Sequence, residues 1–423
     1  MPGPLHGVKV ADFSEIIAAP LGGRLLAELG AEVIKVEPPW GDPWRQNQRF
    51  TETESRSFMV YNRGKRSLPL DLTKSQAQVI LHRLISQVDV VLANYRPDVA
   101  VKLGVDYESL AQVNPRIIYC EVTAYGREGP DAHRPGYDMI IQAQSGLMAS
   151  ETKSENGVPQ QIWSTPLIDT NCGINLMGCV CAALYARERT GLGQKIETNL
   201  LASALTLMGP RFLHVESQDQ ANRGKTLADI AAKRAASASY TETLAASPGS
   251  RRQTHHATMY YRVYLSKDVP LAVGCLNEVQ RRRLLDLLNL EDVYLESGFD
   301  PTSAKAVAYA WDLTQQAEAI FTERTSAEWL GTLEDRGIPA GLVKFAEELF
   351  EDPQIQASGL LTEFEHRDAG TVKMMGPLAK FSESQLAESG SSPALGQHSQ
   401  EILAELGFSA GEYQKWKQEG IVG

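Results

Sequence analysis

Short apolar runs alternate with helical patterns along the first 125 residues of this 423-residue chain. The apolar runs typical of strands occupy residues 8–13, 33–37, 88–92 and 117–123. Segments with helical spacing lie between these runs, at residues 21–29, which Gly30 ends, and at residues 76–87. Near-continuous apolar strands that alternate with helices are typical of a parallel sheet covered on both faces. The pattern therefore predicts an α/β fold with a doubly wound, mainly parallel sheet, whose ligands gather at the carboxyl ends of the strands.

A change in composition separates this region from the rest of the chain. From residue 216 to residue 256, small and polar residues are frequent and large apolar residues are few, as in a linker with some helix and a mobile loop. Residues 260–266 and 271–275 then predict a pair of strands, and residues 278–288 and 327–337 predict amphipathic helices. We therefore predict a large Rossmann-like domain of residues 1–215 completed by residues 346–423, a linker region of residues 216–256, and a smaller α+β domain of residues 257–345.

The charge and the cysteine count narrow the class of protein. A formal net charge of −11 argues against a general nucleic-acid surface, although a local basic pocket for a small polyanion is compatible with it. The amino terminus lacks the pattern of a signal peptide, and no run approaches 18 uninterrupted apolar residues, so we expect no membrane span. Five cysteines, an odd number without framework spacing, indicate reduced thiols. These observations predict a cytoplasmic protein.

The sequence also lacks the patterns of common bound groups. The eight histidines form neither an HxxxH nor an HExxH pattern, so we expect no metal site. No Gly-x-Gly-x-x-Gly follows the first predicted strand, and a nicotinamide or flavin dinucleotide is therefore not indicated.

One carboxylate has a suggestive setting. Asp169 lies directly before a long apolar helical segment that ends at Gly191. A carboxylate at a helix start feels the positive end of the helix dipole, which predicts that it stays ionised. Such a group is either an N-cap, worth about 0.5–2 kcal/mol to the helix, or a nucleophile aimed at a reactive carbonyl. The local sequence leaves both interpretations open.

Basic side chains follow predicted strands on the expected ligand side of the sheet. They occur at residues 62–66, at Arg96 and at Lys102. Arg96 follows a strand and precedes a proline, and a guanidinium there matches phosphate oxygens in a bidentate geometry. The alternative for each group is an ordinary solvated face.

Motifs spread over nearly the whole chain make a family resemblance specific through their order and spacing. They lie at residues 11–13, 19–20, 29–38, 41–42, 62–67, 94–97, 123–126, 129–130, 137–138, 142–148, 190–194, 337–341, 352–354 and 395–398. With these motifs the chain resembles the class III CoA-transferases, the formyl-CoA transferase and carnitine-CoA transferase (CaiB/BaiF-like) family.

The resemblance implies a CoA-transferase without a permanently bound cofactor, in which coenzyme A enters as acyl-CoA substrate. Asp169 would be the nucleophile, forming a mixed anhydride and then an aspartyl-CoA thioester that returns CoA to a carboxylic acid. Backbone donors at the helix start would stabilise the oxyanions, and residues 216–256 would form part of a lid that excludes water. The resemblance also implies an interlocked homodimer. It assigns the CoA nucleotide to Asn94, Tyr95, Arg96, Lys102 and Leu103, and the adenine end to Leu70, Thr73 and Lys74.

The substrate pocket is implied in the same way. Ile17 would face the thioester, with Tyr137, Asp138 and Trp44 beside the reacting groups; Trp40 and Arg45 either close over substrate or only pack their loop. Oxalate-specific members of the family carry a glutamine where this chain has Ile17, and a run of glycines where it has residues 247–252. These two differences argue against a formyl-CoA:oxalate activity and favour a larger or less polar acyl group.

Two alternatives stay open. The first is an α-methylacyl-CoA racemase, because the racemases of this family share the fold. They use a histidine where this chain has Tyr137, and a phenol with a reference pKa near 10 is a poor base. His133, four residues upstream, is a possible substitute or an ordinary loop histidine. The second alternative is a non-catalytic acyl-CoA-binding subunit, which would bind CoA without forming a covalent adduct.

Overall fold

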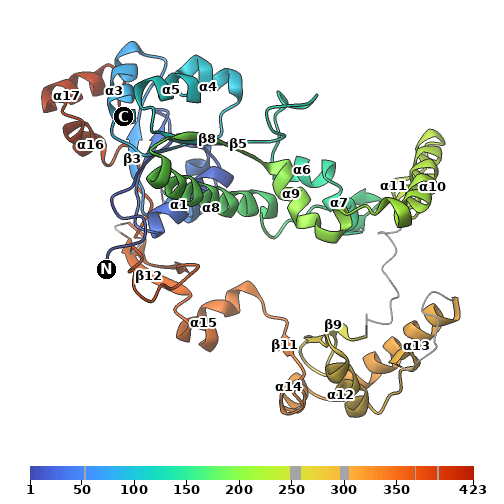
Figure 1. Cartoon of the computed structure of the whole chain (residues 1–423). Helices are drawn as coiled ribbons and strands as arrows, with labels where there is room; N and C mark the ends of the chain where they lie inside the picture. The colour runs from blue at the N-terminus through green and yellow to red at the C-terminus, as the bar shows by residue number, and fades with distance from the viewer. Residues whose placement is uncertain (52–53, 248–258, 296–303, 367, 388–389) are drawn as a thin grey trace. The chain divides into compact units, whose positions relative to one another are not determined.

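The chain forms two compact units in a computed structural model (Figure 1). Unit 1 contains Met1–Ala221 and Gln356–Gly423, and unit 2 contains Asn222–Ile355. The structure describes residues 1–51, 54–247, 259–295, 304–366, 368–387 and 390–423. Most of the loop at residues 247–252, where the sequence departs from the oxalate-specific pattern, lies outside the described residues.

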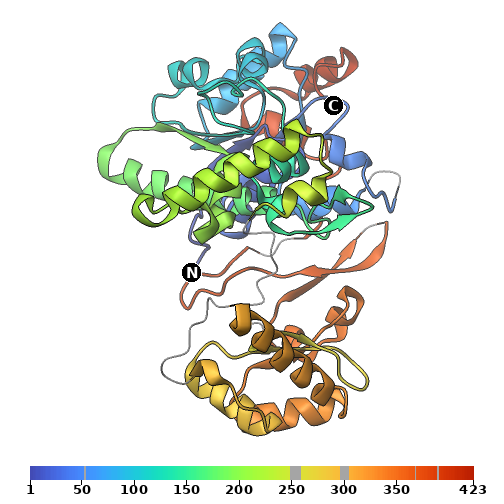
Figure 2. The ribbon, with the colours of Figure 1, turned by 90° about the vertical axis from the view of Figure 1, so that its right-hand side faces the viewer.

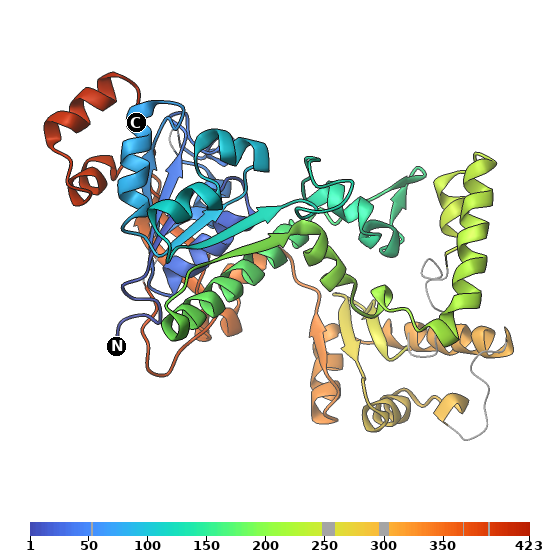
Figure 3. The same ribbon diagram turned by 45° about the horizontal axis from the view of Figure 1, so that its top comes forward.

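A six-stranded parallel sheet forms the centre of unit 1, and its strands β5 and β8 run across the view of Figure 3. Its strands are β1 (Lys9–Asp12), β2 (Glu32–Glu37), β3 (Arg66–Pro69), β4 (Val90–Ala93), β5 (Ile118–Thr123) and β8 (Gln194–Asn199). The spatial order is β3-β2-β1-β4-β5-β8, and β1 pairs with both β2 and β4. The order reverses between β1 and β4, and this switch point is where ligands bind in open parallel sheets.

Helices cover both faces of this sheet because its strands are apolar on both sides. Along β1, Ala11 belongs to one core cluster and Val10 to the other, as the alternation of strand side chains requires. One face packs against α3 (Ser75–Ile85), α4 (Pro97–Leu103), α5 (Tyr107–Val113), α16 (Ser399–Glu405) and α17 (Ala410–Gln418). The other packs against α1 (Ala18–Glu28), α6 (Asp138–Gln144), α7 (Leu147–Ser150), α8 (Leu167–Thr190) and α9 (Leu200–Met208). The predicted α/β fold and the strands and helices of its first half are confirmed.

Glycines let α1 and α8 pack closely side by side. A Cβ atom on Gly22 of α1 would lie 2.5 Å from the Leu176 Cδ2 atom of α8. A Cβ atom on Gly173 of α8 would lie 2.5 Å from the carbonyl oxygen of Ala18. Any larger side chain at these positions would separate the two helices, so their glycines set the distance between the starts of α1 and α8.

Among the described helices, α8 alone is long and apolar enough to cross a bilayer by length and composition. A core helix of a soluble protein passes the same test, and one such helix is weak evidence. Here α8 contributes Ile168, Cys172, Leu176 and Val180 to the core that lies against the sheet. We therefore interpret it as a core helix.

The remaining elements of unit 1 are short. Two hairpins are formed by β6 (Ser154–Glu155) with β7 (Val158–Pro159) and by β12 (Leu361–His366) with β13 (Gly370–Met375); the second is the orange hairpin of Figure 2. The short helices are α2 (Arg56–Asn62), η1 (Pro43–Gln46) and η2 (Gly209–Phe212). Two helices cross the boundary between the units, α10 (Glu216–Ala235) and α15 (Pro353–Ala357).

Unit 2 is a small α+β structure. Its three antiparallel strands are β9 (Tyr261–Tyr264), β10 (Leu271–Gly274) and β11 (Ala340–Leu342), in the order β11-β10-β9. Its helices are α11 (Tyr240–Leu244), α12 (Glu278–Leu288), α13 (Ala304–Phe321) and α14 (Ser326–Asp335), with the turns η5 (Val293–Leu295) and η6 (Ala346–Glu351). Phe321 stacks on Tyr264 at 4.0 Å between ring centroids and contacts the buried Trp329. The predicted strand pair and both predicted helices are confirmed, whereas β11 and the long helix α13 were missed.

The region expected to be a linker is largely helical as far as it is described. It holds α10 and α11, and no side chain of α10 is buried. Residues 248–256 of the predicted linker lie outside the described residues. The assignment of residues 1–215 as a CoA-binding domain stays a prediction.

Candidate active site

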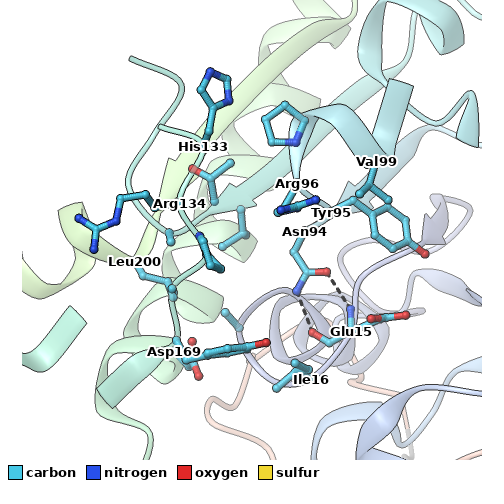
Figure 4. Close-up of a pocket in the computed structure, with 18 of the residues that line it drawn as sticks. Glu15, Ile16, Asn94, Tyr95, Arg96, Val99, His133, Arg134, Asp169 and Leu200 are labelled. Atoms are coloured by element: carbon cyan, nitrogen blue, oxygen red, sulfur yellow. Dashed lines mark hydrogen bonds between the residues drawn. The ribbon is translucent and has the colours of Figure 1, made fainter. Parts of the chain in front are cut away.

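A cavity of about 320 Å³ opens at the switch point of the parallel sheet (Figure 4). Its walls are the segments that follow β1, β4 and β5, together with the first turns of α8 and α9. Seven residues singled out from the sequence line it: Ile17, Asn94, Tyr95, Arg96, His133, Tyr137 and Asp169. The fold therefore brings the proposed nucleophile and part of the proposed CoA site to one place.

Two further cavities share lining residues with this one, and another shares lining residues with one of those two. A cavity of about 140 Å³ shares Tyr95 with it and is also lined by Leu70, Thr73 and Leu103. The next, of about 430 Å³, shares Thr73 and Leu103 with the second and adds the exposed side chains of Lys74 and Lys102. The fourth, of about 520 Å³, shares Ile17 with the first and is lined by Trp44, Tyr61 and Asp138. All predicted site residues thus line a series of cavities within unit 1 in which each cavity shares lining residues with another.

Asp169 does not cap its helix. Helix α8 begins at Leu167, its N-cap residue is Pro166, and Asp169 is the third helical residue with no capping side-chain bond. The N-cap interpretation of Asp169 is therefore wrong. The Oδ2 atom of Asp138 accepts the backbone N–H groups of Ile168 at 2.8 Å and of Asp169 at 3.0 Å, and this second carboxylate satisfies the helix start.

The expected ionisation of Asp169 is also corrected. Burial, and next the charge of Asp138, raise the pKa of Asp169 from 3.8 to about 7. Among the described residues, none donates a hydrogen bond to the Asp169 carboxylate, and the donors at the start of α8 bond Asp138 instead. The carboxylate is accordingly half protonated near neutral pH, and its ionised form lacks the partners that normally stabilise a buried charge.

Asp138 is itself held in place. Its Oδ1 atom accepts a hydrogen bond of 2.5 Å from Gln142 Nε2, and Gln142 Oε1 accepts the backbone N–H of Ile162 at 2.8 Å. Asp138 begins α6 and is buried, whereas the side chain of the neighbouring Tyr137 is exposed. Buried Asp138 therefore shapes the start of α8, and the phenol of Tyr137 is free at the cavity rim.

The oxyanion donors expected at the start of α8 are occupied. The N–H groups of Ile168 and Asp169 bond Asp138, and that of Thr170 bonds the carbonyl of Pro166 at 2.9 Å. A second helix start faces the same cavity, because Ile17 and Ala18 begin α1 and line it. The first N–H groups of a helix have no partner within the helix, and α1 has no side-chain cap. The start of α1 is the better candidate for oxyanion donors.

The predicted basic groups have different surroundings. Arg63 and Lys65 are buried in ion pairs with Glu28 and Asp12, so the group at residues 62–66 is structural rather than a ligand surface. Arg45 is likewise buried, paired with Glu37 below the cavities, and does not close over substrate. Arg96 keeps an exposed guanidinium, 3.0 Å from Asp98, beside the first cavity. Of the predicted basic groups, Arg96 and Lys102, which follow β4, therefore stay available for a phosphate.

Sequence reasoning missed the segment that follows β1. Ile16 has a φ of 75°, a left-handed conformation that costs a β-branched residue about 1–3 kcal/mol. Its N–H lies 3.3 Å from Asp42 Oδ2, which also accepts from the buried Lys35 at 2.8 Å. Two further side chains line the cavity: His133, which the sequence offered as a racemase base or an ordinary loop histidine, and Arg134, which it did not single out. No local pattern marks Ile16, because its conformation depends on contacts with β2 and β4.

Among the described residues, no group of three or more His, Cys, Asp or Glu side chains could hold a metal ion.

Known proteins resemble this chain along nearly its whole length. A sequence profile of "CoA-transferase family III" matches residues 5–399. The chain is 32% identical to succinyl-CoA:glutarate CoA-transferase of Mus musculus, covering 99% of this chain and 90% of that protein. It is 31% identical to succinate–glutarate CoA-transferase of Agrobacterium fabrum, covering 95% and 96%. A crystal structure of a CAIB/BAIF family protein from Brucella suis has a TM-score of 0.73 and 29% identity, covering 96% of this chain and 100% of that one.

Proposed function

The chain belongs to CoA-transferase family III and is a CoA-transferase, and we propose that it moves CoA from an acyl-CoA donor to a carboxylic acid through a covalent intermediate on Asp169. One observation carries the proposal. Asp169 is a buried carboxylate without a hydrogen-bond donor among the described residues, and it opens into the cavity at the switch point of the sheet. A structural carboxylate at this depth would be paired, whereas a nucleophile needs a free oxygen.

The reaction balances through two anhydrides. An Asp169 oxygen attacks the thioester carbon, the carbon–sulfur bond breaks, and CoA thiolate leaves an acyl-aspartyl anhydride. The thiolate attacks the aspartyl carbonyl, which releases the donor acid as a carboxylate and leaves CoA on Asp169 as a thioester. The acceptor carboxylate then attacks this thioester and displaces CoA thiolate. The thiolate attacks the acyl carbon of the new anhydride, which frees Asp169 and the new acyl-CoA.

Three features of the site support these steps. Burial leaves the ionised carboxylate of Asp169 poorly stabilised, and a poorly stabilised carboxylate attacks a carbonyl more readily. The first N–H groups of α1, beside Ile17 and Ala18, lie where they can stabilise the tetrahedral oxyanions. Asp169 is itself buried, which limits the access of water to the anhydrides formed on it.

The series of cavities supports a path for CoA. In this proposal Lys74 and Lys102 bind phosphate groups near the adenine end, where both side chains are exposed. Tyr95 lines the first two cavities and so lies between that end and Asp169. The thioester then reaches the cavity that Ile17 and Asp169 share.

We further propose a small dicarboxylic acid as acceptor. Both Arg134 and His133 line the cavity that contains Asp169, and a guanidinium binds carboxylates in a bidentate geometry. One carboxylate of the acid would attack while the other contacts Arg134. The names of two similar proteins, succinyl-CoA:glutarate and succinate–glutarate CoA-transferase, support the same class of acid.

A racemase is the second candidate, because His133 shares the cavity with Asp169 and could serve as a second acid–base group. In Figure 4 the His133 ring points away from Asp169. Tyr137, at the position where racemases carry histidine, is exposed. The geometry thus supports transfer better than proton exchange at a single carbon.

We also propose that the enzyme is a homodimer. Helix α8 is apolar on most of its surface, and Ile174 and Tyr185 are exposed on the side that the core of unit 1 does not cover. The exposed Trp163 and Phe212 add to the apolar surface of this unit. A second copy of the chain would cover these side chains, and light scattering of the purified protein would show a monomer mass if the proposal is wrong.

Intact-protein mass spectrometry tests the reaction. Wild type, Asp169→Ala and the exposed-loop control Glu128→Ala are each mixed with succinyl-CoA, glutaryl-CoA or a monocarboxylic acyl-CoA, then acidified. We expect a CoA-sized, hydroxylamine-sensitive adduct on wild type and on the control but not on Asp169→Ala. Glutarate should discharge the adduct faster than valerate. Absence of any adduct, with exchange of the α-proton of a 2-methylacyl-CoA in deuterated water, would establish the racemase instead.

A further inference from the structure

The corner between β1 and α1 is strained and held from two sides. Ile16 has a φ of 75° in this corner, a conformation that a β-branched residue rarely adopts. Such a conformation persists only where its surroundings enforce it. The contacts of Glu15 and Ile16 therefore identify the residues that enforce this conformation.

The first contact comes from Asn94, at the end of β4. Its Oδ1 atom accepts the backbone N–H of Glu15 at 2.9 Å, and its Nδ2 atom donates to the carbonyl of Glu15 at 2.8 Å (Figure 4, dashed lines). Both ends of the amide are thus bonded to one residue of the corner. The two strands that flank the switch point, β1 and β4, are joined at their carboxyl ends by this pair of bonds.

The second contact comes from Asp42, beyond β2. Its carboxylate lies 3.3–3.4 Å from the N–H of Ile16 and accepts from the N–H of Trp44 at 2.8 Å. The buried ammonium of Lys35 bonds both Asp42 and the carbonyl of Ser14. The corner is therefore fixed to β2 on one side and to β4 on the other.

This corner sets the start of α1 opposite Asp169. Ile17 and Ala18 follow the corner directly and line the cavity that contains Asp169. The close approach of Gly173 to the Ala18 carbonyl ties the same point to α8, four residues beyond Asp169. A corner free to relax would move the N–H groups of α1 relative to the nucleophile.

We propose that the side chain of Asn94 is a positioning residue, which holds the Glu15–Ile16 corner and thereby the wall of the cavity opposite Asp169, rather than a ligand of CoA. The inference rests on the proposed function, since it assigns Asn94 to the rate of the step at Asp169. Its amide oxygen accepts one hydrogen bond from Glu15 and its amide nitrogen donates one to Glu15, and this pair of bonds fixes the orientation of the side chain toward the corner.

The experiment separates binding from the covalent step. Calorimetry measures the Kd of free CoA for wild type, Asn94→Ala and Asn94→Asp, and rapid-quench mass spectrometry measures adduct formation at saturating acyl-CoA. Asn94→Asp keeps the acceptor for the Glu15 N–H and loses the donor to its carbonyl. We expect both variants to bind CoA within about twofold of wild type and to form the adduct about 10- to 100-fold more slowly, with the alanine variant slower.

Two comparisons make the result decisive. Lys102→Ala removes a proposed CoA contact and should raise the Kd of CoA. Thermal unfolding shows whether each variant is folded. A Kd raised tenfold or more in folded Asn94→Asp or Asn94→Ala, with adduct formation within twofold of wild type, would overturn the inference. If wild type forms no adduct, the proposed function fails by that observation, whereas the CoA titration still decides whether the Asn94 amide is a ligand.

Discussion

The buried carboxylates Asp12 and Asp42 differ from the buried carboxylate Asp169 in their partners and in their ionisation. Asp12 and Asp42, behind the corner after β1, are fully buried beside the ammonium groups of Lys65 and Lys35, at 2.7 and 2.8 Å. Burial opposes the ionisation of Asp12, but the two lysines outweigh it and hold the pKa of Asp12 below its ordinary value. Asp169 is buried to a similar degree without a cation, and its pKa is raised to about 7.

The difference shows that a neighbouring cation, rather than the degree of burial, decides whether a buried carboxylate is ionised and structural or free to react. Lys65 and Asp12 are structural, since each neutralises the other and the lysine also bonds Asn62 and the carbonyl of Pro20. Gly23 of α1 makes room for this pair, because a Cβ atom there would lie 2.8 Å from Asp12 Oδ2. Asp169 has free oxygens in a cavity, which suits a nucleophile and costs stability.

Lys65→Met should have the largest effect, because it turns a paired carboxylate into an unpaired one. Asp12 would be left buried without its nearest cation, and we expect unit 1 to lose about 3–5 kcal/mol of unfolding free energy at pH 7. Urea denaturation followed by circular dichroism measures the loss. Burial lowers the pKa of Lys65 from 10.5 to about 8 even beside Asp12, so between these pH values the unfolded state binds more protons and this lysine should make wild type more stable, not less, as the pH rises.

The control is Lys373→Met, which removes an exposed pair in the hairpin of β12 and β13. Lys373 lies 3.5 Å from Glu363 and both side chains are about half exposed, so a loss of at most about 1 kcal/mol is expected. Equal losses in the two variants would show that the Asp12 pair is not special.

Asp169→Asn should change stability in the opposite direction. A carboxyl whose folded pKa is raised binds a proton in the folded state that the unfolded state has released, so the folded state is disfavoured as the pH rises from about 4 to 7. The amide has no such charge. We expect the variant to be more stable than wild type by up to about 4 kcal/mol at pH 8 and about equal at pH 4.

Denaturation at several pH values, with Glu128→Gln as the exposed control, measures this difference. A gain that is independent of pH would contradict the raised pKa of Asp169, because only titration makes the effect depend on pH. The gain in stability of Asp169→Asn should accompany loss of the covalent adduct, because the catalytic carboxylate is retained at the expense of stability.

Asp138→Asn should have the smallest effect and separates the two causes of the raised pKa. The rate of adduct formation in wild type should rise with pH through about 7, as Asp169 loses its proton. The variant keeps an acceptor for the N–H groups of Ile168 and Asp169 but removes the charge. We expect the midpoint to move below 7 yet to stay above 3.8, because burial is the larger cause.

Rate measurements at saturating acyl-CoA between pH 5 and 9 locate both midpoints. An unchanged midpoint in Asp138→Asn would mean that burial alone sets the pKa of Asp169. A fall to the ordinary value would mean that the neighbouring charge sets it.

Local pattern was sufficient for β1, β2, β4 and β5 of the parallel sheet and for helices α1, α3 and α8, but it did not predict β3 and β8. An apolar run such as residues 88–92 predicts a buried strand because each residue contributes to the same two-sided core. The position of Asp169 at the start of α8 was also predictable, since helix boundaries depend on neighbouring residues. Motif order carried the family assignment, which the profile match over residues 5–399 confirms.

Contacts distant in sequence decided the chemistry of the site. The ionisation of Asp169 depends on Asp138, 31 residues away, and the role of the Asn94 amide depends on Glu15, 79 residues away. The burial of Lys65, read from the sequence as part of a basic surface, depends on Asp12 across 53 residues. A charge or an amide acts according to what folding places beside it, and helix and strand periodicity carry no information on such pairs.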